Sequence, residues 1–143
     1  MNEVSMKKIT YTSLIGITLL VLFAFLVAVP KQWEIVFPTW DTYFHFIGGF
    51  FATLLAVSYY SSEFKKLSQP FAWFTLLGIA LGIGVFWEFF EYLLNVFFST
   101  SISQWLGFHV SFQGNLDDTI KDLAMDTTGA IAAGVIFFRT LRK

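Results

Sequence analysis

Cysteine is absent from this chain of 143 residues, which excludes disulfide bonds, thiolate metal sites and a cysteine nucleophile. Charged residues make up only 13% of the chain, against roughly 25% in a typical soluble domain. The net charge of −1 offers no basic field to attract nucleic acid, so no nucleic-acid partner is expected. Together with a hydrophobic content of 56%, these shortages exclude a soluble enzyme, a disordered chain and a coiled coil, and they indicate a membrane protein.

Four stretches are long and apolar enough to cross a membrane as helices, since a crossing takes about 20 largely apolar residues. They are residues 9–30, 41–60, 70–98 and 117–138. The apolar run of the first stretch is too long for a signal peptide, so we expect a retained helix. The sequence therefore predicts an all-α, polytopic four-helix transmembrane bundle that forms a single domain over residues 1–143. The connection 99–116 is rich in large apolar residues, which predicts that it lies at the membrane surface or re-enters the bundle.

Lysine and arginine gather on one side of the four predicted spans, as they do in cytoplasmic segments of membrane proteins. These residues are Lys7, Lys8, Lys65, Lys66, Arg139, Arg142 and Lys143. The opposite side has only Lys31 in its first loop and no lysine or arginine in the connection 99–116. We therefore expect a multi-pass protein of the cell membrane with both termini in the cytoplasm. Membrane lipids are its expected partners, and assembly into a homo-oligomer is left open.

Acidic residues and one histidine lie in the predicted outer halves of three spans. They are Asp41 and His45 in the second span, Glu88 and Glu91 in the third, and Asp117, Asp118, Asp122 and Asp126 in the fourth. Ionisable groups inside a membrane are costly and usually face a bundle interior or a water-filled cavity. Within each span most of these residues are three or four positions apart, so they share a helix face. The spacing predicts that the three faces converge on one polar site.

Several carboxylates in one low-dielectric site cannot all be ionised unless a bound cation neutralises them. The expected ligands are His45, Glu88, Asp122 and Asp126. An oxygen-rich set with one imidazole suits Mg²⁺, Mn²⁺ or Ca²⁺, and the imidazole also admits Zn²⁺ or Fe²⁺. The alternative is that some of the acids stay protonated and no ion is bound.

Further polar residues are candidates for catalysis or binding beside the expected ligands. A general base that activates water is assigned to Glu91 or Asp118. The remaining candidates are Asp41, Gln113 and Lys121. Plainer interpretations compete, because acids such as Asp118 favour helix starts and Lys121 has the spacing for an ion pair with Asp118.

The order of these motifs resembles that of a bacterial membrane-protein family. The motifs are His45 with Gly48–Gly49, Trp87–Glu88 with Glu91–Tyr92, Gln113–Gly114, Asp118 with Asp122, and Gly129–Ala130. They are similar to those of the YjdF-like inner-membrane proteins and, more weakly, to those of the VanZ-like proteins. Thr42 and Asp126 stand where the VanZ-like pattern often has lysine and asparagine. The resemblance implies a small helical envelope protein with shared acidic and histidine positions, and VanZ-like members are associated with glycopeptide tolerance.

Three classes of function remain open at the level of the sequence. The first is a metal-dependent hydrolase that acts on a lipid-linked or head-group substrate. The second is a non-catalytic lipid-binding or partner scaffold with a structural ion site. The third is a cation- or proton-coupled carrier, which would have to dimerise because the inner halves of the spans carry no matching acids.

Overall fold

The computed structural model describes residues 3–37 and 39–141, so Arg142 and Lys143 of the orientation argument lie outside the described residues. Every regular element in these ranges is helical. The elements are α1 (Glu3–Phe23), a π-helix η1 (Ala24–Ala28), α2 (Trp33–Val36), α3 (Trp40–Tyr59), α4 (Ser61–Phe64), α5 (Gln69–Leu106) and α6 (Leu116–Leu141).

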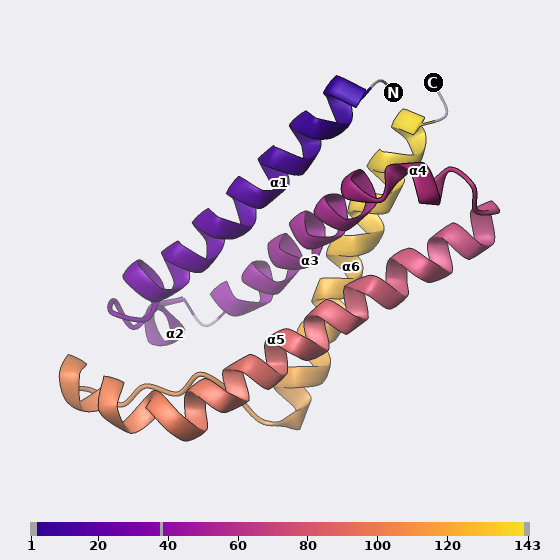
Figure 1. The fold of residues 1–143 in the computed structure, drawn as a ribbon. Coiled ribbons are helices and arrows are strands. Elements are labelled where there is room, and N and C mark those ends of the chain that lie inside the picture. Colours follow the sequence, from indigo (N-terminus) through magenta and orange to yellow (C-terminus); the bar gives the residue numbers. More distant parts are fainter. Residues whose placement is uncertain (1–2, 38, 142–143) are drawn as a thin grey trace.

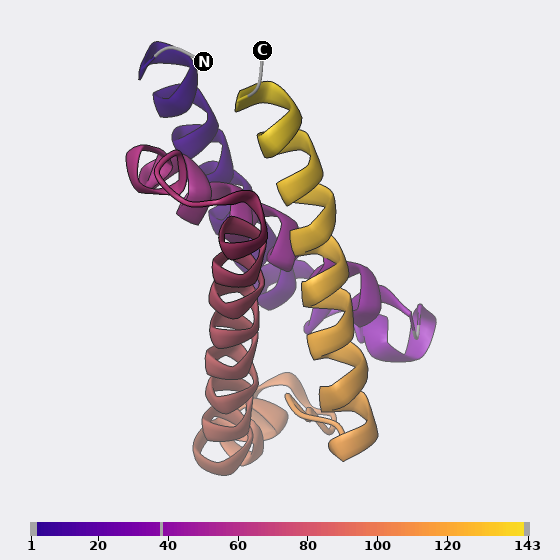
Figure 2. The ribbon, with the colours of Figure 1, turned by 90° about the vertical axis from the view of Figure 1, so that its right-hand side faces the viewer.

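Helix α3 lies at the centre of the bundle and contacts α1, α5 and α6 (Figure 1). Helix α1 begins and α6 ends near α4, whereas α2 lies at the opposite end of the bundle. In the perpendicular view, α5 and α6 diverge toward the end where the connection 107–115 joins them (Figure 2).

Within residues 3–37 and 39–141, three helical segments are long and apolar enough to cross a membrane, namely Val4–Ala28, Trp40–Tyr59 and Gln69–Leu106. Helix α6 is also long, at 26 residues, but its first half carries the acidic residues. The all-α membrane bundle expected from the sequence is therefore confirmed, with three apolar helices and a fourth, more polar one. A helix of 38 residues such as α5 extends about 57 Å at 1.5 Å per residue, so it is much longer than the roughly 30 Å of a hydrocarbon core.

Helix α5 does not end at residue 98 as the sequence suggested, but continues to Leu106. It stops at Gly107, whose positive φ of 79° is costly for any residue with a side chain. The connection expected over 99–116 is therefore shorter and covers residues 107–115. It folds back along α5, because the Asn95 side-chain oxygen accepts a hydrogen bond from the Phe112 amide at 3.2 Å and Ser103 Oγ accepts one from the Val110 amide at 2.8 Å.

Close contact between α3 and α6 depends on two glycines. A side chain at Gly49 would collide with the backbone of Asp126, and one at Gly129 would collide with the carbonyl of Phe46. Small residues of this kind let membrane helices approach until their backbones touch. At Gly78 and Gly82 on α5, by contrast, an added Cβ would meet nothing within 4 Å.

Candidate functional site

His45 lies at the centre of the polar cluster, one helical turn into α3, and its side chain is 1% exposed. Its two ring nitrogens face different groups. Nδ1 lies 3.4 Å from Oδ2 of Asp126 on α6. Nε2 points the other way, toward carboxylates of α3, α5 and α6, and it has no hydrogen-bond partner among the described residues.

Three carboxylate oxygens surround Nε2 of His45. They belong to Asp41 at 3.7 Å, Glu88 at 4.0 Å and Asp122 at 4.0 Å. These separations are too long for hydrogen bonds. They do suit ligands of one ion, because two atoms that each lie 2.0–2.6 Å from an ion are at most about 4.0–5.2 Å apart. The ligand atoms of Asp41, His45 and Asp122 all lie within 4.8 Å of one another, as do those of His45, Glu88 and Glu91.

Helix periodicity explains how each element brings its side chain to this place. The buried face of α5 repeats every fourth residue, in the order Ala72, Leu76, Ala80, Gly84 and Glu88. Glu88 is therefore the polar end of an otherwise apolar stripe. On α6, Asp122 and Asp126 are one turn apart and both buried, at 2% and 6% exposure. Such burial is costly for unpaired acids, so the cluster requires neutralisation by protons or by a cation.

Two neighbouring side chains hold the glutamates in place. Thr119 Oγ1 donates a hydrogen bond of 2.8 Å to Oε2 of Glu88, and Trp87 Nε1 donates one of 2.9 Å to Oε1 of Glu91. The sequence interpretation missed both donors. Thr119 could have been found, since it is three residues before Asp122 and shares its helix face, whereas Trp87 entered the sequence analysis only as part of the motif Trp87–Glu88.

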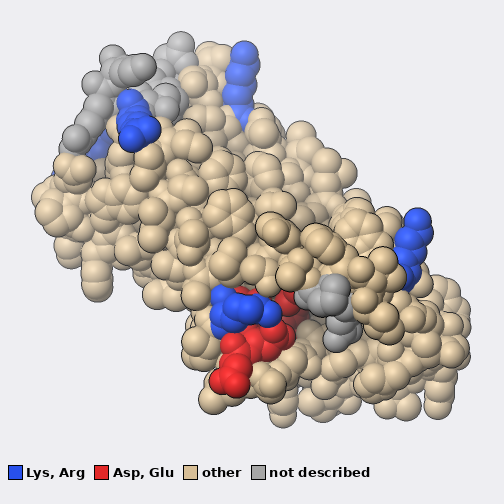
Figure 3. Space-filling view, turned by 180° about the vertical axis from the view of Figure 1, so that it is seen from behind, with Lys and Arg blue, Asp and Glu red and all other residues tan. Residues whose placement is uncertain are grey.

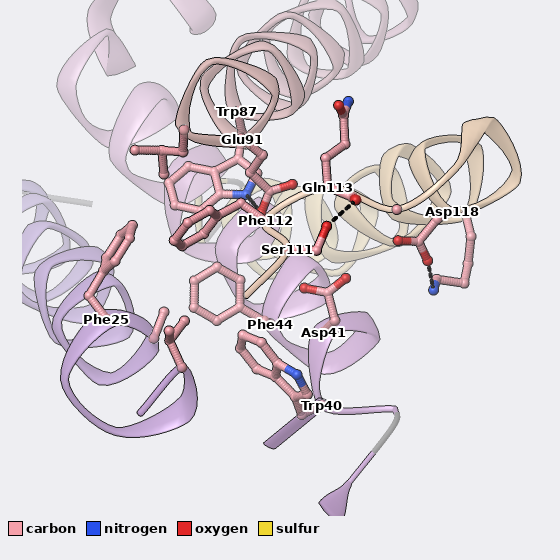
Figure 4. Close-up of a pocket in the computed structure, with 15 residues that line it drawn as sticks. Phe25, Trp40, Asp41, Phe44, Trp87, Glu91, Ser111, Phe112, Gln113 and Asp118 are labelled. Atoms are coloured by element: carbon pink, nitrogen blue, oxygen red, sulfur yellow. Dashed lines mark hydrogen bonds and ion pairs between the residues drawn. The ribbon is translucent and has the colours of Figure 1, made fainter. Parts of the chain in front are cut away.

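A pocket of about 180 Å³ adjoins the cluster (Figure 4). One side is aromatic, with Phe25, Phe44 and Trp40, and the other is polar, with Asp41 and Asp118. The polar part is completed by Glu91, Ser111, Gln113 and Lys121. The pocket has the mixed lining expected of a site that receives an amphipathic molecule.

Acidic side chains gather at one place on the face of the molecule shown in Figure 3, next to a basic side chain, and most of that face is uncharged. Lys121 forms a salt bridge with Asp118 and lies 3.8 Å from Oδ1 of Asp122. The ion pair considered from the sequence spacing is therefore present. Asp118 is engaged by Lys121 in this structure, whereas the carboxylate of Glu91 lines the pocket and belongs to a group that could hold an ion.

The structure thus brings together most of the residues singled out in the sequence. His45, Glu88, Asp122 and Asp126 form the buried cluster. The half-buried Asp41 joins this cluster to the pocket, which is also lined by Glu91, Gln113, Asp118 and Lys121. Asp117 is exposed on the first turn of α6 and belongs to neither group. Asp126 differs from the other expected ligands, because it meets the opposite ring nitrogen of His45.

Comparison with known proteins gives one match. The family described as "Predicted membrane protein (DUF2238)" matches residues 4–143. No curated protein and no solved structure matches the chain.

Proposed function

The chain belongs to the DUF2238 family of predicted membrane proteins, and we propose that it is a metal-dependent hydrolase of the cell envelope that acts on the head group of a membrane lipid or on a lipid-linked substrate. One observation carries the proposal. A buried imidazole nitrogen without a hydrogen-bond partner faces carboxylate oxygens of α3, α5 and α6 at 3.7–4.0 Å.

The ligands proposed for the ion are His45, Asp41, Glu88 and Asp122. Their chemistry, one imidazole with several carboxylates, suits Mn²⁺ or Zn²⁺ well and also admits Mg²⁺ or Ca²⁺. Asp126 has a different part in this arrangement. By accepting a hydrogen bond from Nδ1–H of His45, it would fix the ring with Nε2 toward the ion, as carboxylates commonly do behind metal-binding histidines.

Glu91 is the residue proposed as general base. Its carboxylate lines the pocket and is held by the Trp87 indole N–H. In hydrolysis of a phosphoester, the water oxygen forms a bond to phosphorus while Glu91 accepts a water proton. The bond between phosphorus and the leaving oxygen breaks, and that oxygen takes up the proton that Glu91 accepted, which returns Glu91 to its ionised form. The ion at the neighbouring cluster would supply charge stabilisation for the phosphate oxygens.

The place of the cluster supports a lipid substrate. It lies near the start of α3 and of α6, at the end of the bundle away from α4 and the described chain ends (Figure 1). Lys7, Lys8, Lys65, Lys66 and Arg139 belong to segments at the other end, so the positive-inside rule would put the cluster in the outer leaflet, where head groups lie. We further propose kinship with the YjdF-like and VanZ-like proteins on the motifs that contain His45, Glu88 and Asp122.

Metal binding by the purified protein in detergent tests the centre directly. Addition of Mn²⁺ or Zn²⁺ at a hundredfold excess over the dissociation constant should stabilise the fold by about 2.7 kcal/mol, and a chelator should remove the effect. Glu88→Gln and Asp122→Asn should lose most of the metal-dependent shift in melting temperature. The matched control is Asp117→Asn, which should respond to the metal like the parent.

Catalysis is tested by release of the head group from vesicles of phosphatidylglycerol and phosphatidylethanolamine in the presence of the stabilising ion. Glu91→Gln should abolish release but keep the metal-dependent stabilisation. Stabilisation by metal without release would favour a scaffold with a structural ion, and no stabilisation by any of the four ions would overturn the metal centre itself.

A further inference from the structure

A second pocket, of about 90 Å³, lies on the other side of His45. Its walls come from α1, through Ile17, Leu20 and Val21, and from α5, through Ile83 and Gly84. Half of the remaining lining residues are glycine or alanine of α3 and α5. The polar side chains in the lining are those of His45, Asp126 and Trp87.

The second pocket is lined by residues of the apolar helical segments that are long enough to cross a membrane. Ile83 at its rim is 42% exposed, and the α1 residues lie near the middle of the apolar segment Val4–Ala28. At that depth the surrounding medium is hydrocarbon rather than water. The carboxylate of Asp126 lies beside Nδ1 of His45, so an occupant need not provide a hydrogen bond to it.

The two pockets share a wall. Phe44 and Trp87 line both of them, and their rings lie 5.8 Å apart between centroids. The polar pocket therefore lies on one face of this aromatic pair and the apolar pocket on the other. A molecule with a polar head and an apolar tail matches this division of chemistry.

We propose that the apolar pocket between α1 and α5 receives a hydrocarbon chain of the lipid whose head group enters the polar pocket. This inference rests on the proposed function, because it takes the head group to be the ligand beside the metal cluster. At about 90 Å³, this pocket has half the volume of the polar pocket, at about 180 Å³, and its lining is mainly apolar. It therefore suits a short segment of hydrocarbon chain better than a charged head group. The occupant is thus defined by its chemistry as an aliphatic chain of a membrane lipid.

Glycine at position 48 keeps the pocket open. A Cβ at Gly48 would meet only the Leu20 side chain, at 3.7 Å, which is ordinary contact. Gly48→Leu should therefore fill the pocket without a backbone collision. Gly82→Leu on α5 is the matched control. It is the same substitution, a Cβ at Gly82 would meet nothing within 4 Å, and Gly82 does not line the pocket.

Photo-crosslinking with phosphatidylglycerol that carries a diazirine within one acyl chain tests the proposal on the full-length protein in vesicles. Peptides that contain Ile17, Val21 and Ile83 should be labelled several-fold more than the lipid-facing Phe74 and Phe97. Gly48→Leu should lower that excess at least fivefold, whereas Gly82→Leu should keep it. Both variants should keep the Mn²⁺-dependent rise in melting temperature, which reports the folded cluster.

The outcomes separate this inference from the proposed function. Labelling spread evenly over all lipid-facing helices, or labelling unchanged in Gly48→Leu, would overturn the chain pocket. Labelling of the parent protein at the expected residues, without any metal-dependent stabilisation of that same parent protein, would support the chain pocket while it overturns the metal centre. A Gly48→Leu protein that changes its oligomeric state instead of its labelling would assign the pocket to a second copy and overturn the lipid assignment.

Discussion

Nδ1 of His45 lies 3.4 Å from Oδ2 of Asp126, where α3 and α6 approach most closely. This contact gives the two acids of α6 different parts. Asp126 lies behind the imidazole, and Asp122 lies in front of it at 4.0 Å from Nε2. In a metal centre, the acid behind the ring would orient it and the acid in front would bind the ion.

Asp126→Asn should therefore weaken Mn²⁺ binding about tenfold, near the lower end of the effects reported for residues that orient a metal-binding histidine. The neutral amide still accepts a hydrogen bond from Nδ1 but loses its charge. Asp122→Asn should weaken binding further, because it removes an anionic ligand. Titration of free Mn²⁺ by electron paramagnetic resonance measures both constants, and equal losses in the two variants would contradict the assignment of different roles.

Thr119→Val should reduce both stability and metal affinity, because it removes the 2.8 Å hydrogen bond to Glu88 while it keeps the side-chain volume. A hydrogen bond to a charged group contributes about 1.5–3 kcal/mol. Thr119→Ser should restore the affinity. The control is Thr128→Val, since Thr128 bonds only to the backbone of its own helix at Ala124 and is exposed. If Thr128→Val were as harmful as Thr119→Val, the effect would not come from Glu88.

The sequence was enough to predict the helical bundle and most of the residues that form its polar cluster. Apolar runs of about 20 residues have few stable alternatives to a membrane helix, and the spacing of Asp41 with His45 places both on one face of α3. The same reasoning identified Glu88 and Asp122 as acids that face a bundle interior. Such arguments need only the period of the helix.

Which acids lie near Nδ1 of His45 and which lie near Nε2 could not be predicted from helix periodicity. It depends on where α6 crosses α3, and that crossing follows from the contacts of Gly49 and Gly129 with opposing backbone. The fold of the connection 107–115 could not be predicted either. It depends on a hydrogen bond from the Phe112 amide to the side chain of Asn95, which lies 17 residues earlier in the sequence. Periodicity gives the face of one helix, whereas the register between helices depends on tertiary packing.

Gly129→Ala should destabilise the protein by about 1–3 kcal/mol, the usual cost of forcing an extra methyl group into a closely packed contact. The new methyl group would collide with the carbonyl of Phe46. Gly82→Ala adds the same group to open space inside α5, so it should leave the stability unchanged or raise it by up to about 1 kcal/mol. Thermal unfolding of both variants in one detergent compares them. Similar melting temperatures would contradict close packing of α6 on α3.

The proposed orientation can be tested because the chain has no cysteine of its own. Ser62→Cys, on α4, should resist a membrane-impermeant thiol reagent in intact cells, and Ser101→Cys, near the end of α5, should react. Both serines are exposed, so burial would not explain a difference. Disruption of the cells should make Ser62→Cys reactive. Labelling of Ser62→Cys before disruption would reverse the orientation and place the cluster in the inner leaflet.

Stabilisation by Mn²⁺ should depend on pH with a definite sign. The carboxylates and the neutral imidazole must be free of protons in order to bind the ion, so protons compete with the metal for the same atoms. The metal-dependent rise in melting temperature should therefore be largest near pH 8 and should shrink steadily as the pH is lowered, because protons displace the ion from its ligand atoms. His45→Gln should lose most of this stabilisation at every pH. A metal-dependent stabilisation of His45→Gln as large as that of the parent would place the ion elsewhere in the molecule, because no other residue supplies the nitrogen ligand of this cluster.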